Sequence, residues 1–264
     1  MMTTLQFRQL HLSKDFQSIE FLSDLHLDLT RLTTFKAWQK YMLNTQADAI
    51  FILGDLFESW VGADILDAPA PLGDFERQCA SVIQKAAEKS IIYIMAGNRD
   101  FLLAQDFADK TDSTLLPDPT LLLWGKHRTI ITHGDLLCTD DTAYQEYRKM
   151  VHSPAWQQQA LAMPLEQRIQ VALQMRAQSE QSKQTNSDAI MDVNPQAVLS
   201  WLQAAEATCI IHGHTHRPQD HLLSDELERI VLSDWDLDTA PEKQRAEILQ
   251  WSIAEGLKRI AMQA

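Results

Sequence analysis

SIEFLSDLH, residues 18–26, decides the fold together with AIFILGD at residues 49–55 and IIYIMAGNRD at residues 91–100. Each stretch begins with a short apolar run, at Ser18–Leu22, Ala49–Leu53 and Ile91–Met95, that is rich in isoleucine and other strand-favouring residues. Each run is followed by a cluster that contains an aspartate or an asparagine. Short apolar runs of this kind are typical of buried strands. We therefore expect each polar cluster to lie at the carboxyl end of a strand.

The same arrangement recurs in the second half of the chain. Thr129–Thr132 precedes His133, and Cys209–Ile211 precedes a His-Gly-His sequence that ends at His214. Helical patterns at Arg31–Asn44 and Phe75–Lys89 separate the early strands, which indicates βαβ units and an α/β class.

Antiparallel strands are expected towards the end of the chain. Leu121–Trp124 and His127–Thr132 flank a Gly-Lys pair, a pattern that predicts a hairpin with a tight turn. Further strands are predicted at His221–Leu223, Arg229–Leu232 and Glu247–Ile253. We therefore expect a four-layer α/β/β/α sandwich of two mixed sheets.

The chain of 264 residues suits a single domain over residues 1–264 with one insertion. The interval from His133 to His214 is roughly double the earlier intervals between clusters. Its surplus, at about residues 141–190, has a helical pattern interrupted at Pro154 and Pro164. We interpret it as a helical insertion that forms a lid over the active edge of the sheets.

Composition excludes some classes of function. A net charge of −13 and a pI near 5.0 disfavour non-specific nucleic-acid binding, which needs a basic face. The three cysteines lack the spacing of a disulfide framework, and we find no signal-peptide pattern and no long apolar run. These features favour a reduced cytoplasmic protein. If the substrate is a phosphate, the acidic chain needs metal ions as a local source of positive charge.

Five strand-end clusters can point into one crevice, because ligands of open α/β sheets bind beyond the carboxyl ends of the strands. Taken singly, a strand-end aspartate is usually a turn residue, and an isolated His-x-His is usually a surface accident. Five together indicate a shared metal site. The candidate ligands are Asp24, His26, Asp55, Asn98, His133, His214 and His216.

These ligand types define the class of metal. Carboxylate, imidazole and amide donors without thiolate suit Mn²⁺, Fe²⁺, Co²⁺ or Zn²⁺, and the oxygen share favours Mn²⁺. Seven ligands are too many for one octahedral ion that keeps a water molecule. We therefore expect two divalent ions that share a bridging carboxylate.

The set of motifs D-x-H, G-D, G-N-x-[DE], H-G-D and G-H-x-H resembles the calcineurin-like metallophosphoesterase superfamily over about residues 18–220. Within it, the chain is most similar to the UDP-2,3-diacylglucosamine hydrolase family, the pyrophosphatases of lipid A synthesis. The similarity extends through GDLFE at 54–58, GNRDF at 97–101 and IMDVN at 190–194.

The resemblance implies roles for individual residues. One ion is held by Asp24, His26, Asp55 and His216, and the other by Asp55, Asn98, His133 and His214. The catalytic set is Asp55, Asn98, Arg99 and His133. The substrate contacts are Asn98, Arg99, Asp141, Arg176, Ser179, Lys183, Asn186 and His214. The family usually has lysine at the position of Asn186 and a small polar residue at that of Lys183; this sequence exchanges the two.

Arg99 discriminates within the superfamily. Members that expel an alcohol usually have a histidine after the asparagine, which protonates the leaving group. An arginine cannot donate a proton at working pH, so the leaving group here needs no acid. A phosphate that leaves from a pyrophosphate meets that condition. The alternative is an arginine that only forms a structural salt bridge. Asp100 is expected either to orient His133 or Arg99, or to cap a helix.

The insertion has apolar residues at helical spacing, at Leu165, Ile169 and Leu173, with Ala172 and Met175 beside them. Its bulkier apolar residues are Tyr144, Met150, Val151, Trp156, Leu161 and Met163. Ordinary packing on the core explains them from the residues alone. The resemblance implies instead that acyl chains lie between the insertion and the main domain.

The family implies hydrolysis of UDP-2,3-diacylglucosamine to UMP and 2,3-diacylglucosamine 1-phosphate. It also implies a monomer attached peripherally to the cytoplasmic face of the inner membrane. One alternative is a calcineurin-like phosphodiesterase or nucleotide-diphosphate hydrolase with a soluble substrate. Another is a non-catalytic metal-held scaffold, which is disfavoured because all seven ligands are present.

Overall fold

The isoleucine-rich runs form strands with the predicted bounds: β2 (Ser18–Leu22), β3 (Ala49–Leu53) and β4 (Ile91–Met95). The structure is a computed structural model that describes residues 7–185 and 192–263, with the backbone alone for residues 178–185. Helix α1 (Leu32–Asn44) joins β2 to β3, and α2 (Asp74–Ala87) joins β3 to β4, as predicted.

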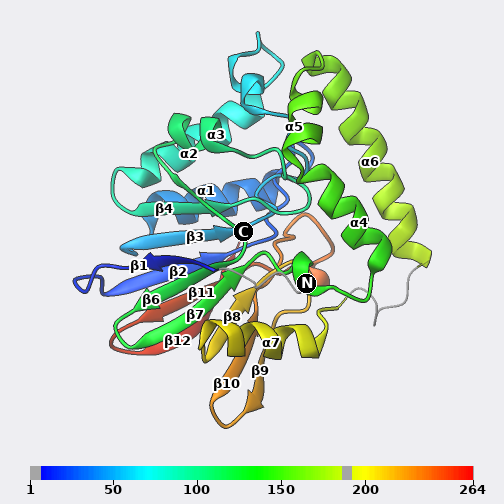
Figure 1. Ribbon diagram of the computed structural model, residues 1–264. Helices are drawn as coiled ribbons and strands as arrows, with labels where there is room; N and C mark the ends of the chain where they lie inside the picture. Colours follow the sequence, from blue (N-terminus) through cyan, green and yellow to red (C-terminus); the bar gives the residue numbers. More distant parts are fainter. Residues whose placement is uncertain (1–6, 186–191, 264) are drawn as a thin grey trace.

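Two six-stranded mixed sheets are present within the described residues, and the predicted α/β/β/α class is confirmed (Figure 1). One sheet has the order β12-β11-β2-β3-β4-β5, in which β2 to β5 are parallel. The other has the order β1-β6-β7-β8-β10-β9. The remaining strands are β1 (Arg8–His11), β5 (Thr114–Leu116), β6 (Thr120–Trp124), β7 (His127–Thr132), β8 (Cys209–His212), β9 (Gln219–Ser224), β10 (Leu227–Val231), β11 (Glu247–Ser252) and β12 (Gly256–Ala261).

The antiparallel predictions are confirmed. β6 and β7 form the hairpin, with Trp124 opposite His127 across the tight turn. β9 pairs antiparallel with β10, and β11 pairs antiparallel with both β2 and β12. Pairing between β10 and β8 is parallel, so β10 extends the sheet that carries the later polar clusters.

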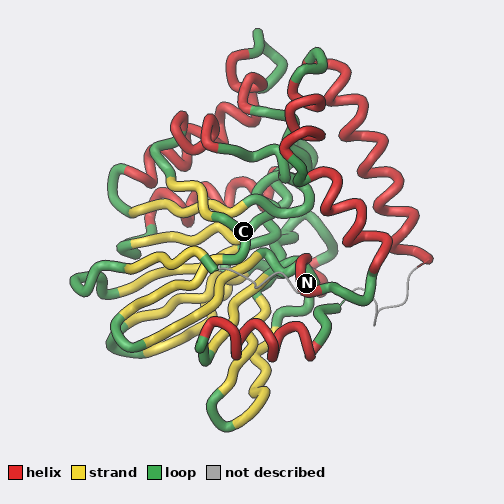
Figure 2. Tube along the Cα trace, in the orientation of Figure 1, coloured by secondary structure: helices red, strands yellow, loops and turns green. Residues whose placement is uncertain are grey.

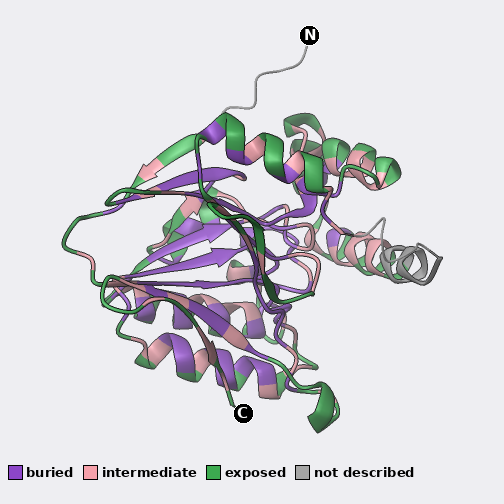
Figure 3. Ribbon diagram, turned by 90° about the horizontal axis from the view of Figure 1, so that it is seen from below, coloured by how far each residue is buried: buried purple, intermediate pink, exposed green. Residues whose placement is uncertain are grey.

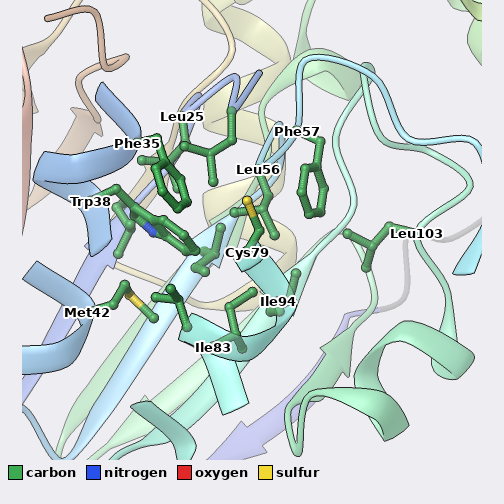
Figure 4. Close-up of a cluster of buried hydrophobic side chains, with 14 of the residues drawn as sticks. Leu25, Phe35, Trp38, Met42, Leu56, Phe57, Cys79, Ile83, Ile94 and Leu103 are labelled. Carbon is green, nitrogen blue, oxygen red and sulfur yellow. The ribbon is translucent and has the colours of Figure 1, made fainter. Parts of the chain in front are cut away.

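Alternation along β3 explains the layers. Ile50 and Ile52 pack with α1 and α2, whereas Phe51 and Leu53 face the other sheet. The space between the first sheet and helices α1 and α2 is filled by side chains of the helices, among them Trp38, Met42, Cys79 and Ile83 (Figure 4). Helix α7 (Pro195–Ala205) covers the outer face of the second sheet. Buried residues are concentrated in the strands, and exposed ones lie on the outer surface of the helices (Figure 3).

The insertion contains α4 (Thr142–Val151), α5 (Pro154–Leu161) and α6 (Leu165–Thr185), which lie together beside the loops that follow the strands (Figure 1). Ser153 caps α5 with Pro154 in its first turn, and Pro164 precedes α6, so both prolines separate helices as predicted. Shorter elements complete the described chain: α3 (Gln105–Lys110) and the 3₁₀ turns η1 (Ala63–Asp67), η2 (Asp135–Leu137) and η3 (Pro241–Lys243). No helix of the described ranges is both long and apolar enough to cross a bilayer.

Candidate metal centre

All seven candidate ligands lie at one edge of the molecule, where strands of both sheets end. Asp24 and His26 follow β2, Asp55 follows β3 and Asn98 follows β4. From the second sheet, His133 follows β7, and His214 and His216 follow β8. The loops that carry them gather between the strand ends and the insertion (Figure 2). Packing of the two sheets therefore brings together residues that are far apart in the chain.

One half of the centre is formed by Asp24, His26, Asp55 and His216. The Nε2 atoms of His26 and His216 are 3.2 Å apart. Asp24 Oδ1 lies 3.4 Å from Nε2 of His216 and 3.9 Å from that of His26, and Asp55 Oδ2 is 3.9 Å from His26 Nε2. Four donor atoms thus surround one small volume.

The other half is formed by Asp55, Asn98, His133 and His214. Asn98 Oδ1 lies 2.9 Å from His133 Nε2 and 2.8 Å from His214 Nδ1. Asp55 Oδ1 lies 3.7 Å from His133 Nε2, so the two carboxylate oxygens of Asp55 face the two halves. This is the geometry that a bridging carboxylate requires.

A buried, unsatisfied oxygen shows that these residues fit a cation. Asp24 is fully buried, and its Oδ1 has no hydrogen-bond partner among the described residues. A buried carboxylate oxygen without a donor is costly unless a cation satisfies it. Donor atoms of Asp24, His26 and His216 lie within 4.8 Å of one another, as do those of Asp24, Asp55 and His133. The centre therefore has the donors and the spacing for divalent ions.

The outer nitrogens of three ligand histidines contact fixed acceptors. His26 Nδ1 lies 2.9 Å from Glu58 Oε2, and His216 Nδ1 lies 3.3 Å from Asp234 Oδ2. His133 Nδ1 is 3.0 Å from the carbonyl oxygen of Leu53. The hydrogen bond to Leu53 selects the tautomer of His133 in which Nε2 is free to bind a metal, and the carboxylates of Glu58 and Asp234 lie beside the outer nitrogens of His26 and His216.

Sequence reasoning assigned no role to Glu58 or Asp234. Asp234 comes shortly after β10. The same strand-end rule that identified the seven ligands would have found it. Glu58 lies three residues after Asp55, inside the GDLFE segment. Only the folded structure reveals that it lies next to His26.

The backbone of the centre is unusual. Five of the seven ligands have a positive φ: Asp24, His26, Asp55, His214 and His216. Each such non-glycine residue costs about 1–2 kcal/mol. Backbone strain of this kind is characteristic of functional sites, where the surrounding fold holds it in place.

Glycines at two positions allow the loops to approach the ligands closely. A Cβ on Gly213 would lie 2.2 Å from both Asp24 Oδ2 and Ser23 Oγ, and one on Gly97 would lie 2.2 Å from Asp55 Oδ1. The glycines of the G-H and G-N motifs are therefore needed for steric reasons.

Electrostatics also favour cations. Burial lowers the pKa of His133, but Asp55 and Asp24 outweigh it and raise that pKa to about 9. Burial likewise lowers the pKa of His216, whereas the nearby carboxylates of Asp234 and Asp24 raise it to about 10. Burial and the charge of His133 lower the pKa of His214 to about 3. The carboxylates that attract protons to His133 and His216 attract divalent cations for the same reason.

Comparison with known proteins agrees with this geometry. The family model for calcineurin-like phosphoesterase matches residues 18–218. A UDP-2,3-diacylglucosamine hydrolase of Bordetella parapertussis is 42% identical over 83% of this chain and 85% of its own length. The enzyme of that name from Serratia proteamaculans is 41% identical over 87% of this chain and 96% of its own. This chain belongs to the UDP-2,3-diacylglucosamine hydrolase family of calcineurin-like phosphoesterases. Like them, it is a metal-dependent hydrolase.

Asp100 has a different role from either prediction. Its buried carboxylate accepts backbone N–H groups of Gly97 at 2.6 Å, Leu56 at 2.8 Å and Asp55 at 3.3 Å. It therefore joins the G-D loop to the G-N loop, and orients the backbone of both instead of orienting His133 or Arg99 or capping a helix. Burial and the charge of Asp55 raise its pKa to about 7.

A cavity of about 640 Å³ extends from the phosphoesterase centre to the insertion. Its polar end is lined by Glu58, Asn98, Arg99, His214 and His216. The rest of its lining is mostly apolar and comes from all three helices of the insertion and from the main body, with Arg168 and Arg217 among the charged exceptions. The apolar lining includes Tyr144, Tyr147, Trp156, Ala160, Met163, Val171, Ala172, Met175, Trp60, Phe101 and Leu102.

The expected substrate contacts are distributed unevenly. Asp141 and Arg176 line the cavity; Asp141 also caps α4 by accepting from Tyr144 N. Arg176 Nε lies 3.1 Å from Glu58 Oε1. Ser179 and Lys183 lie on the part of α6 whose side chains are not described, and Asn186 lies outside the described residues.

Both interpretations of the apolar stripe hold for different residues. Leu165, Ile169 and Ala172 pack on the core, and Ala172 and Met175 also line the cavity. The grouping of Leu173, Met150 and Leu161 with the packed residues was wrong, because they are 53%, 48% and 41% exposed. Leu173 faces away because it lies on the outer surface of α6, next to the pocket residue Ala172. Leu161 is exposed in part although its Cδ2 lies close to Gly62 of the main body.

Proposed function

We propose that this protein hydrolyses the pyrophosphate bond of UDP-2,3-diacylglucosamine, giving UMP and 2,3-diacylglucosamine 1-phosphate. One observation carries the proposal: a single cavity joins the seven-ligand centre to an apolar compartment beneath the insertion. In a substrate with a pyrophosphate between a nucleotide and a diacylated sugar, the pyrophosphate suits the ligand centre and the acyl chains suit the apolar compartment. The printed names of the relatives support the same substrate.

The centre supplies positions for two cations. Asp24, His26, Asp55 and His216 would hold one, and Asp55, Asn98, His133 and His214 the other. When bound, two divalent ions lower the pKa of a water molecule and neutralise phosphoryl oxygens. We infer Mn²⁺ as the preferred ion, because three of the seven ligands offer oxygen. Water attacks the α-phosphorus and the glycolipid phosphate leaves.

Arg99 explains why a pyrophosphate suits this centre. Its side chain is 8% exposed and lines the cavity beside Asn98. A guanidinium stays protonated, so it cannot protonate a leaving group, but it can stabilise the negative charge that builds on a departing phosphate. The departing phosphate needs no proton, because its second pKa is about 6.

We further propose that the protein works as a monomer attached peripherally to the cytoplasmic face of the inner membrane. Support comes from the substrate itself, because two acyl chains confine it to a bilayer surface. Co-sedimentation with vesicles that contain the substrate tests this attachment, and a protein that stays in the supernatant would contradict it.

Substrate choice is tested directly with purified protein and Mn²⁺. UDP-2,3-diacylglucosamine, UDP-glucose and a chromogenic phosphodiester are incubated in parallel, and UMP and chromophore are measured. We expect UMP from the acylated substrate only. Hydrolysis of the diester alone would favour a phosphodiesterase with a soluble substrate and would overturn the proposal.

A further inference from the structure

Glu58 contacts three functional side chains at once. Its Oε2 lies 2.9 Å from Nδ1 of His26, a candidate metal ligand. Its Oε1 lies 3.1 Å from Nε of Arg176 and 3.5 Å from Nη1 of Arg99. The side chains of Glu58, Arg99 and His26 are 10%, 8% and 7% exposed, so the contacts among them are shielded from solvent. The Arg176 side chain is 40% exposed, so its pair with Glu58 is partly screened by water.

The three partners come from separate parts of the fold. His26 follows β2 and Arg99 follows β4, whereas Arg176 lies on α6 of the insertion. Glu58 itself is held in place because its N–H donates to the carbonyl of Leu27, beside His26 in the chain. One carboxylate therefore links the metal centre, the arginine beside it and the helix that covers the cavity.

We propose that Glu58 is a positioning residue that orients His26 for metal binding. Through Arg176 it also docks α6 over the cavity, and it holds Arg99 beside the reacting phosphates. Each carboxylate oxygen has its own partners: Oε2 contacts His26, and Oε1 contacts the two arginines. Glu58 is a counter-charge of both guanidinium groups, and Arg176 Nη1 also lies 3.8 Å from Asp28 Oδ2. An incoming pyrophosphate is a second anion for the same pair, so it meets arginines that are already in place. This last consequence rests on the proposed function.

Asp234 provides a matched control in the same protein. It also stands behind a ligand histidine, with Oδ2 at 3.3 Å from His216 Nδ1. Its arginine partner, however, is Arg245, whose Nη2 is 2.7 Å from Asp234 Oδ2 and which does not line the cavity. Loss of Asp234 should therefore affect metal binding without affecting α6.

Three variants separate the functions: Glu58→Ala, Glu58→Gln and Asp234→Ala. The amide oxygen of glutamine can still accept from His26 Nδ1–H, but its amide NH₂ cannot attract the arginines. Mn²⁺ affinity is measured by calorimetry, and hydrogen exchange is followed over residues 165–177 of α6. Neither measurement needs the substrate, so both remain valid if the proposed function fails.

We expect Glu58→Ala and Asp234→Ala to weaken Mn²⁺ binding by about 10- to 100-fold, and Glu58→Gln to leave it within about threefold. Exchange in α6 should accelerate in both Glu58 variants and stay unchanged in Asp234→Ala. With the acylated substrate and saturating Mn²⁺, kcat/KM of Glu58→Gln should fall at least tenfold.

A purely structural Glu58 gives a different pattern. It would lower Tm in both variants but leave the Mn²⁺ affinity of the folded protein and the exchange of α6 as in the parent. Either unchanged value in Glu58→Ala would overturn the proposal. If both change as expected while the parent releases no UMP, the positioning role stands and the proposed substrate fails.

Discussion

At the scale of single residues, the centre depends on side chains that lie where the backbone is least relaxed. Asp24, Asp55 and His214 all have a positive φ, and Gly213 and Gly97 pass within contact distance of ligand oxygens. These features follow from the need to bring ligands from two sheets into one small volume. They also make the centre sensitive to changes that add a single carbon.

Gly213→Ala should abolish metal binding. The added Cβ would meet Asp24 Oδ2 and Ser23 Oγ at 2.2 Å, so the G-H loop or Asp24 must move. We expect a loss of about 1–3 kcal/mol in stability and a loss of bound Mn²⁺, measured by denaturant unfolding and elemental analysis. Gly125→Ala is the control, because its φ of 59° disfavours alanine but no atom of the described residues lies within 4 Å of the added Cβ. Equal Mn²⁺ content in the two variants would contradict this reasoning.

Arg99→His should change the preference between leaving groups. A histidine can protonate an alkoxide, so the rate on an unactivated alkyl phosphodiester relative to the pyrophosphate substrate should rise roughly tenfold or more. Arg99→Lys serves as the control, since it keeps the charge without adding an acid of suitable pKa. The ratio of kcat/KM for the two substrates is the measurement, and a constant ratio across all three proteins would refute the role given to Arg99.

His152 should make the fold sensitive to mild acid. Burial and the charge of Arg148 lower its pKa to about 4, below the usual 6.5, and Asp135 opposes that shift only in part. Nε2 of His152 is buried without a partner in the described chain. The unfolded state therefore binds the proton more readily between pH 6.5 and 4, so acidification through this range destabilises the fold.

The comparison variant for this prediction is His152→Gln. As pH falls from 6.5 towards 4, the parent should lose on the order of 1–2 kcal/mol of unfolding free energy relative to the variant. Urea unfolding at several pH values measures the difference. If the unfolding free energies of the two proteins changed in parallel with pH, protonation of His152 would not destabilise the fold, and the prediction would be wrong.

At the scale of elements, the strands predicted most precisely were the buried ones, although the exposed edge strand β9 was also predicted in part. Strands β2, β3 and β4 were predicted to the residue because they are short, mostly apolar runs that are buried along nearly all their length. Edge strands β1, β5 and β12 were not predicted, because β1 and β12 are largely exposed and β5 has only three residues. Their pairing is determined by neighbours far away in the sequence, and local pattern carries little of that information.

The same limit applies to the candidate centre. The clustering of the seven candidate ligands was predictable because each follows a recognisable strand. Glu58, and the bridging contacts of Asp100 between two loops, depend on how those loops meet, so only the fold reveals them. The exposure of Leu173 beside Ala172 was likewise decided by the way α6 packs.

Neighbouring residues of α6 offer a test of the apolar compartment. Ala172 lines the cavity, whereas Leu173 faces solvent. Ala172→Trp should lower kcat/KM for substrates with long acyl chains by roughly tenfold, and have less effect with short chains, because the indole fills part of the apolar volume that long chains need. Leu173→Trp adds the same group outside and should leave both substrates unaffected. A similar loss for short and long chains in Ala172→Trp would place the acyl chains elsewhere.

At the scale of the whole molecule, the proposed ions would join the two sheets. Asp24, Asp55 and Asn98 follow strands of one sheet, and His133 and His214 follow strands of the other. Bound ions would therefore add to the inter-sheet core formed by residues such as Phe51 and Ile211. Ligand binding to the native state alone raises its stability.

Metal removal should consequently lower the thermal stability of the entire fold. Two ions, each present at 100 times its Kd, contribute about 5 kcal/mol, which corresponds to a decrease in Tm on the order of 10–20 °C after treatment with a chelator. Differential scanning calorimetry with Mn²⁺ and with EDTA measures the shift. An Asp55→Asn variant should show little further change with EDTA; a full shift in that variant would show that the stabilising ions bind elsewhere.

Electron paramagnetic resonance of the protein loaded with two equivalents of Mn²⁺ tests the dinuclear centre most directly. Two ions that share the Asp55 carboxylate at about 3.5–4 Å should give an exchange-coupled multiline spectrum, and Asp55→Asn should reduce it to the six lines of isolated Mn²⁺. A six-line spectrum from the parent protein at full occupancy would contradict a shared site for two ions.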